Sequence, residues 1–169
     1  MDEYKSRKNT RLQNADYNQQ RAVFITLCTL NRRCILSRIS VGTGVLDGPD
    51  VELLQFGRIA EKYIKQLNDF YPHLSIESYV IMPNHIHMLI FFNEESGPSR
   101  TPVPTLQNST LSRFISTFKR FCNKECGENI WQYRSYDHII RNKRDYDAHL
   151  KYIYDNPSQW LYDDMFSNE

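Results

Sequence analysis

Two histidines stand two residues apart in an apolar segment of the chain, HIHMLIFFN at 85–93. If this segment is a β-strand, His85 and His87 point to the same face, because successive side chains alternate between faces. Their Cβ atoms would then lie roughly 6–7 Å apart, given a rise of ~3.3 Å per residue. Two imidazoles at that separation can converge on one cation, and imidazole is a common ligand for first-row divalent metals. The alternative is that one ring is solvated and the other holds an ordinary hydrogen bond.

A tyrosine and an asparagine near the C-terminus, in KYIYDNP at 151–157, form the second candidate group. On a helix, Tyr152 and Asn156 lie one turn apart on one face, and His149 can share that face. A phenol has a free pKa of ~10, so it attacks effectively when its proton is removed or when a metal neutralises the phosphate. The Asn156 amide oxygen could complete a metal site with the two histidines of the strand.

Tyr152 has competitors for this role, since the chain contains eleven tyrosines and two others lie nearby. Tyr154 is displaced by about 200° from Tyr152 around a helix with ~100° per residue, so only one of them can face the metal. Tyr146 lies further upstream. Tyr152 could also be an ordinary core or surface aromatic residue.

Other metal and nucleotide chemistries fit these residues less well. A hydrolase or transferase of the histidine-triad kind needs a third alternating histidine, and Leu89 stands at that position. A structural zinc site needs four Cys or His ligands, and the spacings here offer no such set. The cysteines form no Cys-x-x-Cys pair and are expected to be buried thiols; they are Cys28, Cys34, Cys122 and Cys126.

Runs of apolar and β-branched residues predict four strands, at 22–30, 74–82, 85–93 and, less regularly, 130–142. Pro83-Asn84 predicts a tight hairpin turn between the second and the third. The face of the third strand opposite the histidines is expected to be core; it carries Ile86, Met88, Ile90 and Phe92.

Three helices are predicted from apolar positions that recur every three or four residues. Asp50, after a loop at 40–50, is expected to cap the first, which runs to about residue 71. The second follows Ser109 or Thr110 as its cap, and the third runs from Asp145 to a stop at Pro157. Because residues before proline avoid the α region, Asn156 is expected to be the last helical residue.

The element order β-α-β-β-α-β-α predicts an α+β fold. The expected form is a ferredoxin-like (split βαβ) antiparallel sheet with helices on one face and a C-terminal tyrosine-bearing helix. The 169 residues suit a single domain, which we place at 21–162, after a polar arm at 1–20 and before a short acidic tail at 163–169. No apolar run approaches the ~20 residues needed to span a bilayer. The polar N-terminus does not resemble a secretory signal, so we expect a cytoplasmic protein without a membrane partner.

The net charge of +1 does not by itself indicate a nucleic-acid partner, but basic residues gather toward the C-terminal half. Basic side chains among aromatic ones suit a phosphate backbone with unstacked bases. The candidates for DNA binding are Arg113, Lys119, Arg120, Lys124, Arg141, Lys143 and Arg144. On charge alone, these residues are more typical of a solvated helix face than of a DNA-binding surface.

Taken together, two segments resemble a known family. YVIMPNHIHMLIFF, at 79–92, resembles the metal-binding strand of the HUH (His-hydrophobic-His) single-tyrosine transposases. DHIIRN, at 137–142, followed by KYIYDNP, is similar to the REP-associated tyrosine transposases, a branch of that superfamily. The resemblance spans roughly residues 20 to 160.

The resemblance implies a set of roles for residues in this chain. His85 and His87 would bind Mg²⁺ or Mn²⁺, and Asn156 would be the third ligand, where the insertion-sequence branch has Gln. Tyr152 would be the nucleophile. His138 lies where the family also carries a histidine, so we expect it, like His149, to neighbour the site.

The expected activity is metal-dependent nicking and rejoining of single-stranded DNA carrying a hairpin, through a 5′-phosphotyrosine intermediate. The alternative is a catalytically retired, host-adapted protein that binds nucleic-acid hairpins without cutting them. The resemblance allows a monomer or a homodimer, and the Asn-Pro ending favours the monomer weakly.

Overall fold

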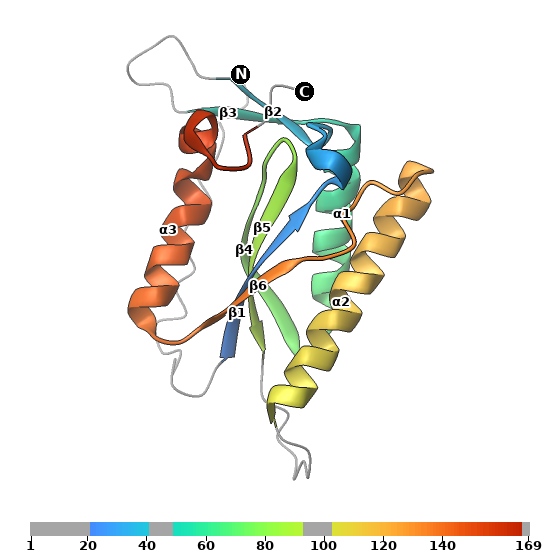
Figure 1. The fold of residues 1–169 in the computed structure, drawn as a ribbon. Helices are drawn as coiled ribbons and strands as arrows, with labels where there is room; N and C mark the ends of the chain where they lie inside the picture. Colours follow the sequence, from blue (N-terminus) through green and yellow to red (C-terminus); the bar gives the residue numbers. More distant parts are fainter. Residues whose placement is uncertain (1–20, 41–48, 93–102, 167–169) are drawn as a thin grey trace.

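The computed structural model describes residues 21–40, 49–92 and 103–166, so the polar arm expected at 1–20 lies outside the described residues. Within these ranges a four-stranded antiparallel sheet has the order β4-β5-β1-β6 (Figure 1). Its strands are β1 (Arg21–Cys28), β4 (Leu74–Ile81), β5 (His85–Phe92) and β6 (Tyr136–Ile140). A separate hairpin is formed by β2 (Ser37–Ser40) and β3 (Asp50–Leu53).

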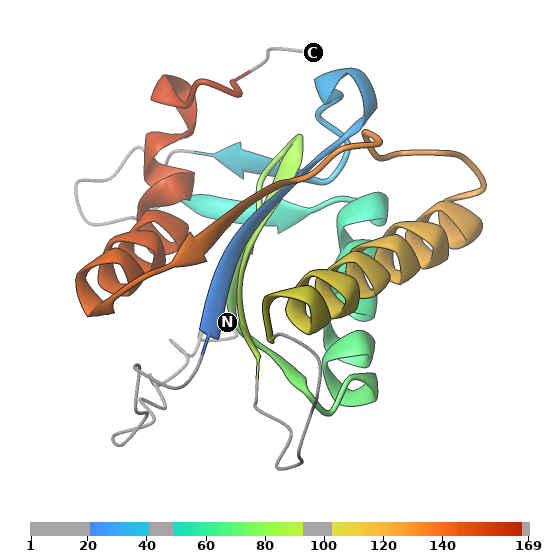
Figure 2. The same cartoon turned by 60° about the horizontal axis from the view of Figure 1, so that its bottom comes forward.

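Three helices pack on the two faces of this sheet. α1 (Gln55–Phe70) and α2 (Val103–Cys126) lie on one side, and α3 (Lys143–Gln159) lies on the other (Figures 1 and 2). Short 3₁₀ turns, η1 (Leu30–Arg32) and η2 (Trp160–Tyr162), follow β1 and α3. The predicted α+β antiparallel sheet is confirmed, with α1 and α2 sharing one face and the tyrosine-bearing helix covering the opposite one.

Strand alternation in β5 explains why the sheet is covered on both sides. All eight residues of β5 are buried. The predicted core face, with Ile86 and Met88, packs in the cluster that α1 and α2 cover. Leu89 and Phe91 pack instead with Ile153 of α3. Both histidines therefore lie on the α3 side, at the end of β5 nearest the 83–84 turn.

The start of the first helix differs from the expectation. Asp50 begins strand β3 and pairs with Ser40, so it does not cap a helix, and α1 starts only at Gln55. The Leu54 N–H bonds to the Leu36 carbonyl, and a Cβ at Gly57 would meet the same oxygen at 1.9 Å. The start of α1 is thus packed against Leu36, directly before β2. The segment expected to be a loop at 40–50 ends at the first residue of β3.

The bounds of the other two helices also need correction. α2 begins at Val103, so neither Ser109 nor Thr110 caps it. The cap of α3 is Asn142, whose side chain accepts a hydrogen bond of 3.0 Å from the Asp145 backbone N–H. Pro157 does not end α3, which continues to Gln159 with Asn156 inside the helix. Burial of Trp160, the first residue of η2, favours this continuation.

The cysteines match their expected burial only in part. Cys122 is fully buried in the core, whereas Cys28, Cys34 and Cys126 are half-buried free thiols. Burial raises the pKa of Cys28 and Cys34, so these thiols are not activated nucleophiles.

Candidate active site

The imidazoles of His85 and His87 meet on the α3 side of the sheet. Their ring centroids are 4.5 Å apart, and both side chains are buried. In each ring the Nδ1 atom has a hydrogen-bond partner, whereas Nε2 is buried without one. Two buried nitrogens without partners are costly unless they serve another ligand.

The partner of His85 fixes which ring nitrogen carries the proton. Asn84 donates its amide hydrogens to the backbone oxygens of Arg32 (3.3 Å) and Met165 (2.7 Å). Its Oδ1 therefore faces His85 and accepts the Nδ1–H bond at 2.8 Å. The proton stays on Nδ1, and the lone pair of His85 is held at Nε2.

Thr26 plays the same part for His87. It stands opposite His87 in the β1–β5 pairing, and its hydroxyl oxygen lies 2.8 Å from Nδ1 in a buried contact. When Thr26 accepts this hydrogen bond, the Nε2 lone pair of His87 is available as well. Metal-binding histidines are commonly oriented in this way by a hydrogen bond at the second nitrogen.

Both imidazoles are neutral at physiological pH. Burial lowers the pKa of His85 to about 4, although the nearby Asp163 carboxylate raises it slightly. Burial, with smaller contributions from His85 and His149, lowers the pKa of His87 to about 2. A neutral imidazole is the form that binds a cation.

Tyr152 and Asn156 reach this histidine pair from α3. The ring centroid of Tyr152 lies 5.1 Å from that of His87, and 44% of the residue is exposed to solvent. Asn156 is buried, and its Oδ1 is a third buried atom without a partner. Its side chain is close enough to affect the pKa of both His85 and Tyr152. Three atoms without partners, two nitrogens and one oxygen, thus lie beside an accessible phenol.

The phenol itself is not ionised at neutral pH. Burial and the nearby Asp163 carboxylate raise the pKa of Tyr152, and the Asn156 side chain offsets this only in part. Of its two competitors, Tyr146 is buried against Phe91, and Tyr154 is exposed two residues along the helix. Tyr152 is the one of these three whose ring contacts His87.

Several residues at the site have roles that the sequence did not predict. Thr26 and Asn84 hold the imidazoles, and Trp160 of η2 lies 6.0 Å from His85 between ring centroids. Asp163, predicted only as the start of an acidic tail, has Oδ2 3.5 Å from the Asn156 amide nitrogen. The one available signal was that Asn84 directly precedes His85 in the turn.

His138, Asp145 and His149 form a second cluster where β6 leads into α3. His138 Nε2 lies 3.0 Å from one carboxylate oxygen of Asp145, and His149 Nδ1 lies 3.1 Å from the other. The ligand atoms of the three residues lie within 4.8 Å of one another, so the cluster is a candidate metal site. Phe24 separates it from the first site, with its ring centroid 4.7 Å from that of His149 and 5.0 Å from that of His87.

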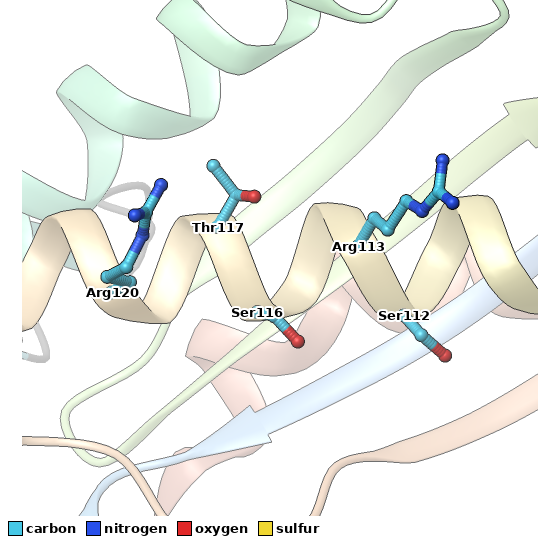
Figure 3. Close-up of a pocket in the computed structure, with 5 residues that line it drawn as sticks. All are labelled: Ser112, Arg113, Ser116, Thr117 and Arg120. Atoms are coloured by element: carbon cyan, nitrogen blue, oxygen red, sulfur yellow. The ribbon is translucent and has the colours of Figure 1, made fainter.

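The basic residues predicted to bind DNA fall into two groups. Arg113 and Arg120 are exposed on α2, on the face of the sheet opposite the histidines. With the side chains of 112, 116 and 117 they line an open hollow of about 380 Å³ (Figure 3). Lys124 is exposed on the same helix, whereas Lys119 donates to the carbonyls of Gln132, Tyr133 and Arg134 at 2.7 to 3.4 Å.

The second group lies on the α3 side of the sheet. Arg141, Lys143 and Arg144 are exposed where β6 leads into α3. Lys143 pairs with Asp147 at 3.1 Å. Among the described helices, none is both long enough and apolar enough to cross a membrane.

Comparison with known proteins places this arrangement among transposases. Residues 55–156, more than half of the chain, match the family model described as "Transposase IS200 like". An uncharacterised protein of Haemophilus influenzae is 26% identical over 174 residues, covering 95% of this chain and 93% of that protein. A REP-associated tyrosine transposase of Escherichia coli is 35% identical over 83 residues, covering 48% of this chain and 43% of that protein.

One solved structure shares the fold over most of the chain. It is a REP-associated tyrosine transposase bound to a REP hairpin, and it is similar with a TM-score of 0.56 at 26% identity. The match covers 82% of this chain and 67% of that chain. The match to the Escherichia coli relative covers less than half of each protein, so the similarity concerns only part of both.

Proposed function

The chain belongs to the IS200-like transposase family, and from that premise we propose that it nicks and rejoins single-stranded DNA at a hairpin. Tyr152 is the nucleophile in this proposal. The observation that carries it is the set of three buried atoms without partners, His85 Nε2, His87 Nε2 and Asn156 Oδ1, beside the accessible Tyr152 phenol. A purely structural role would leave these three polar atoms uncompensated.

The donor set fits the divalent cation that the family resemblance implies. Two neutral imidazole nitrogens and one amide oxygen would hold Mn²⁺ better than Mg²⁺, which prefers oxygen ligands, and three protein ligands would leave coordination positions for oxygens of the substrate. When bound, such a cation offsets the negative charge that develops on the scissile phosphate. Asn84 keeps the His85 lone pair at Nε2, and Thr26 does the same for His87 when its hydroxyl accepts the Nδ1–H bond.

The proposed step forms one bond and breaks one. Tyr152 Oη attacks the phosphorus in line, the P–O3′ bond breaks, and a 5′-phosphotyrosine and a free 3′-hydroxyl result. The phenol proton passes to water, and the departing 3′ oxygen takes a proton from water. Because the phosphotyrosine retains the energy of a phosphodiester, a second 3′-hydroxyl can attack it and restore Tyr152. The raised pKa of the phenol means that Tyr152 loses its proton only as it attacks.

The positions of the basic residues suggest how DNA lies on the protein. Arg141, Lys143 and Arg144 stand at the β6–α3 junction, on the side of the sheet that carries the histidines. We therefore assign backbone contacts near the cleavage point to this group, and contacts further along the hairpin to Arg113 and Arg120 on α2. Loss of one phosphate contact should weaken the binding of all DNA sequences by a similar factor. It should also reduce the slope of log K against log salt concentration by ~0.7 to 0.9.

Tyr152 contacts His87 of the same molecule, so one chain can supply both the proposed nucleophile and the histidine pair. We therefore propose that the protein acts in cis, which agrees with the weak preference for a monomer over a homodimer drawn from the sequence. Sedimentation of active protein on its hairpin substrate tests this, and activity confined to a dimeric species would contradict it.

Cleavage of a labelled hairpin oligonucleotide tests the proposal. Wild-type protein with Mn²⁺ should give a covalent protein–DNA adduct on a denaturing gel, and Tyr152→Phe should give none. Tyr154→Phe is the matched control, because it removes the same hydroxyl from an exposed tyrosine on the same helix. Equal adduct in the wild type and Tyr152→Phe would remove Tyr152 from its role. Tight hairpin binding without cleavage in several divalent metals would instead support the retired, host-adapted binding protein.

A further inference from the structure

The cluster formed by His138, Asp145 and His149 has the geometry of a metal site in its own right. Asp145 Oδ1 lies 3.2 Å from His138 Nε2 and 3.1 Å from His149 Nδ1. We propose that these three side chains bind a second divalent transition-metal ion, of which Zn²⁺ is the representative, separately from the site at His85 and His87.

The two separations at Oδ1 are those expected of neighbouring ligands on one ion. Ligands ~2.1 Å from an ion lie roughly 3.0 Å apart at octahedral angles and roughly 3.4 Å apart at tetrahedral angles. The observed 3.1 and 3.2 Å lie between these limits. The other carboxylate oxygen, Oδ2, lies 3.0 Å from His138 Nε2 and accepts the Arg141 backbone N–H at 3.0 Å, which holds the carboxylate between the two imidazoles.

The two rings are already arranged side by side. Their centroids are 4.7 Å apart with an interplanar angle of 18°, so the nitrogen edges of His138 and His149 face the same carboxylate. Without an ion, His138 Nε2 donates a hydrogen bond to the Asp145 carboxylate, and His149 Nδ1 donates to the backbone oxygen of Asp145 at 2.8 Å. Binding requires the lone pairs of His138 Nε2 and His149 Nδ1, so the proton on each of these nitrogens must leave it when the ion binds.

The ligand chemistry indicates which ions suit this cluster. Two imidazoles and one carboxylate favour Zn²⁺ and its first-row neighbours over Mg²⁺, which prefers oxygen ligands. Because the protein supplies three ligands and the rings lose a hydrogen bond, we expect weaker binding than at a closed structural zinc site with four ligands. Water would complete the coordination, in agreement with the partial exposure of all three residues.

An ion at this cluster would join the sheet to the tyrosine helix. His138 belongs to β6, whereas Asp145 and His149 belong to α3, with His149 three residues before Tyr152. The site stands apart from the proposed DNA chemistry, because its ligands do not include a residue assigned to that reaction.

Nitrogen-15 NMR of the five histidines during a Zn²⁺ titration tests the proposal. We expect His138 Nε2 and His149 Nδ1 to shift to metal-bound values in the wild type, and Asp145→Asn to weaken this response at least about tenfold. Asp147→Asn is the matched control, since it makes the same change on an exposed residue of the same helix and should leave the response intact. His138→Asn, on the edge strand, repeats the test if Asp145→Asn fails to fold.

The outcomes separate this proposal from the proposed function. If His138 and His149 keep their metal-free shifts throughout the titration, or respond equally in Asp145→Asn, the second site is refuted and the cluster is a hydrogen-bonded contact only. A response, or none, at His85 and His87 in the same spectra reports on the proposed active site independently.

Discussion

Removing the Thr26 hydroxyl tests whether His87 is held ready for a metal. Thr26→Val keeps the shape of the side chain but deletes the oxygen 2.8 Å from His87 Nδ1. Both residues are buried, so water cannot replace the lost partner. A buried donor left without a partner costs about 1 to 3 kcal/mol, and we expect unfolding free energy to fall by that amount.

The same change should weaken metal binding. Loss of a hydrogen bond that orients a metal-binding histidine typically costs about 10- to 100-fold in affinity, or ~1.4 to 2.7 kcal/mol. Titration calorimetry with Mn²⁺ measures this directly, and urea denaturation of the metal-free protein gives the stability term. Thr117→Val is the matched control, because Thr117 accepts a hydrogen bond from Tyr71 on the opposite side of the sheet. Unchanged Mn²⁺ affinity in a folded Thr26→Val protein would show that Thr26 does not prepare His87 for a metal.

Three further predictions concern charge and burial. Asp163→Ala should weaken Mn²⁺ binding about tenfold, because the Asp163 carboxylate orients the Asn156 amide. Asp164→Ala is the control and should change the affinity less than about twofold. Equal effects of the two variants in titration calorimetry would contradict this. Burial lowers the pKa of His85 from 6.5 to about 4 and that of His87 to about 2, so the unfolded chain binds more protons than the folded one below pH 6.5. The free energy of unfolding should therefore be greatest above pH 6.5 and fall toward pH 4, by on the order of 3 kcal/mol from His85 alone and further from His87, and denaturation curves independent of pH would exclude this. Lys119→Met should lower the free energy of unfolding by about 1 to 3 kcal/mol, because three backbone carbonyls lose their hydrogen-bond donor. The exposed Lys124→Met should lower it by less than about 0.5 kcal/mol, and equal shifts in melting temperature for the two variants would contradict this.

The parts of the site that local periodicity governs were predictable from the sequence. Strand alternation placed His85 and His87 on one face, and both rings do meet there. Helical periodicity placed Tyr152 and Asn156 together, and the structure brings both to the histidine pair. In these cases the period of a single element decides which side chains are neighbours.

Features that depend on contacts between distant segments were not predictable. The β2–β3 hairpin pairs Ser40 with Asp50, and nothing in the local pattern distinguished Asp50 there from a helix cap. Asp163 reaches Asn156 only because η2 turns the chain back after Trp160. The approach of His138 to Asp145 likewise depends on β6 pairing with β1, which a pattern in β6 alone does not specify.

Peptide mapping of the protein–DNA adduct identifies the residue that attacks the DNA. Wild-type protein would be incubated with a hairpin oligonucleotide and Mn²⁺, digested with protease and nuclease, and analysed by tandem mass spectrometry. We expect a nucleotide joined through phosphate to the Tyr152 side chain, in a peptide from α3. A nucleotide mapped to Tyr154 or to any other residue would contradict it.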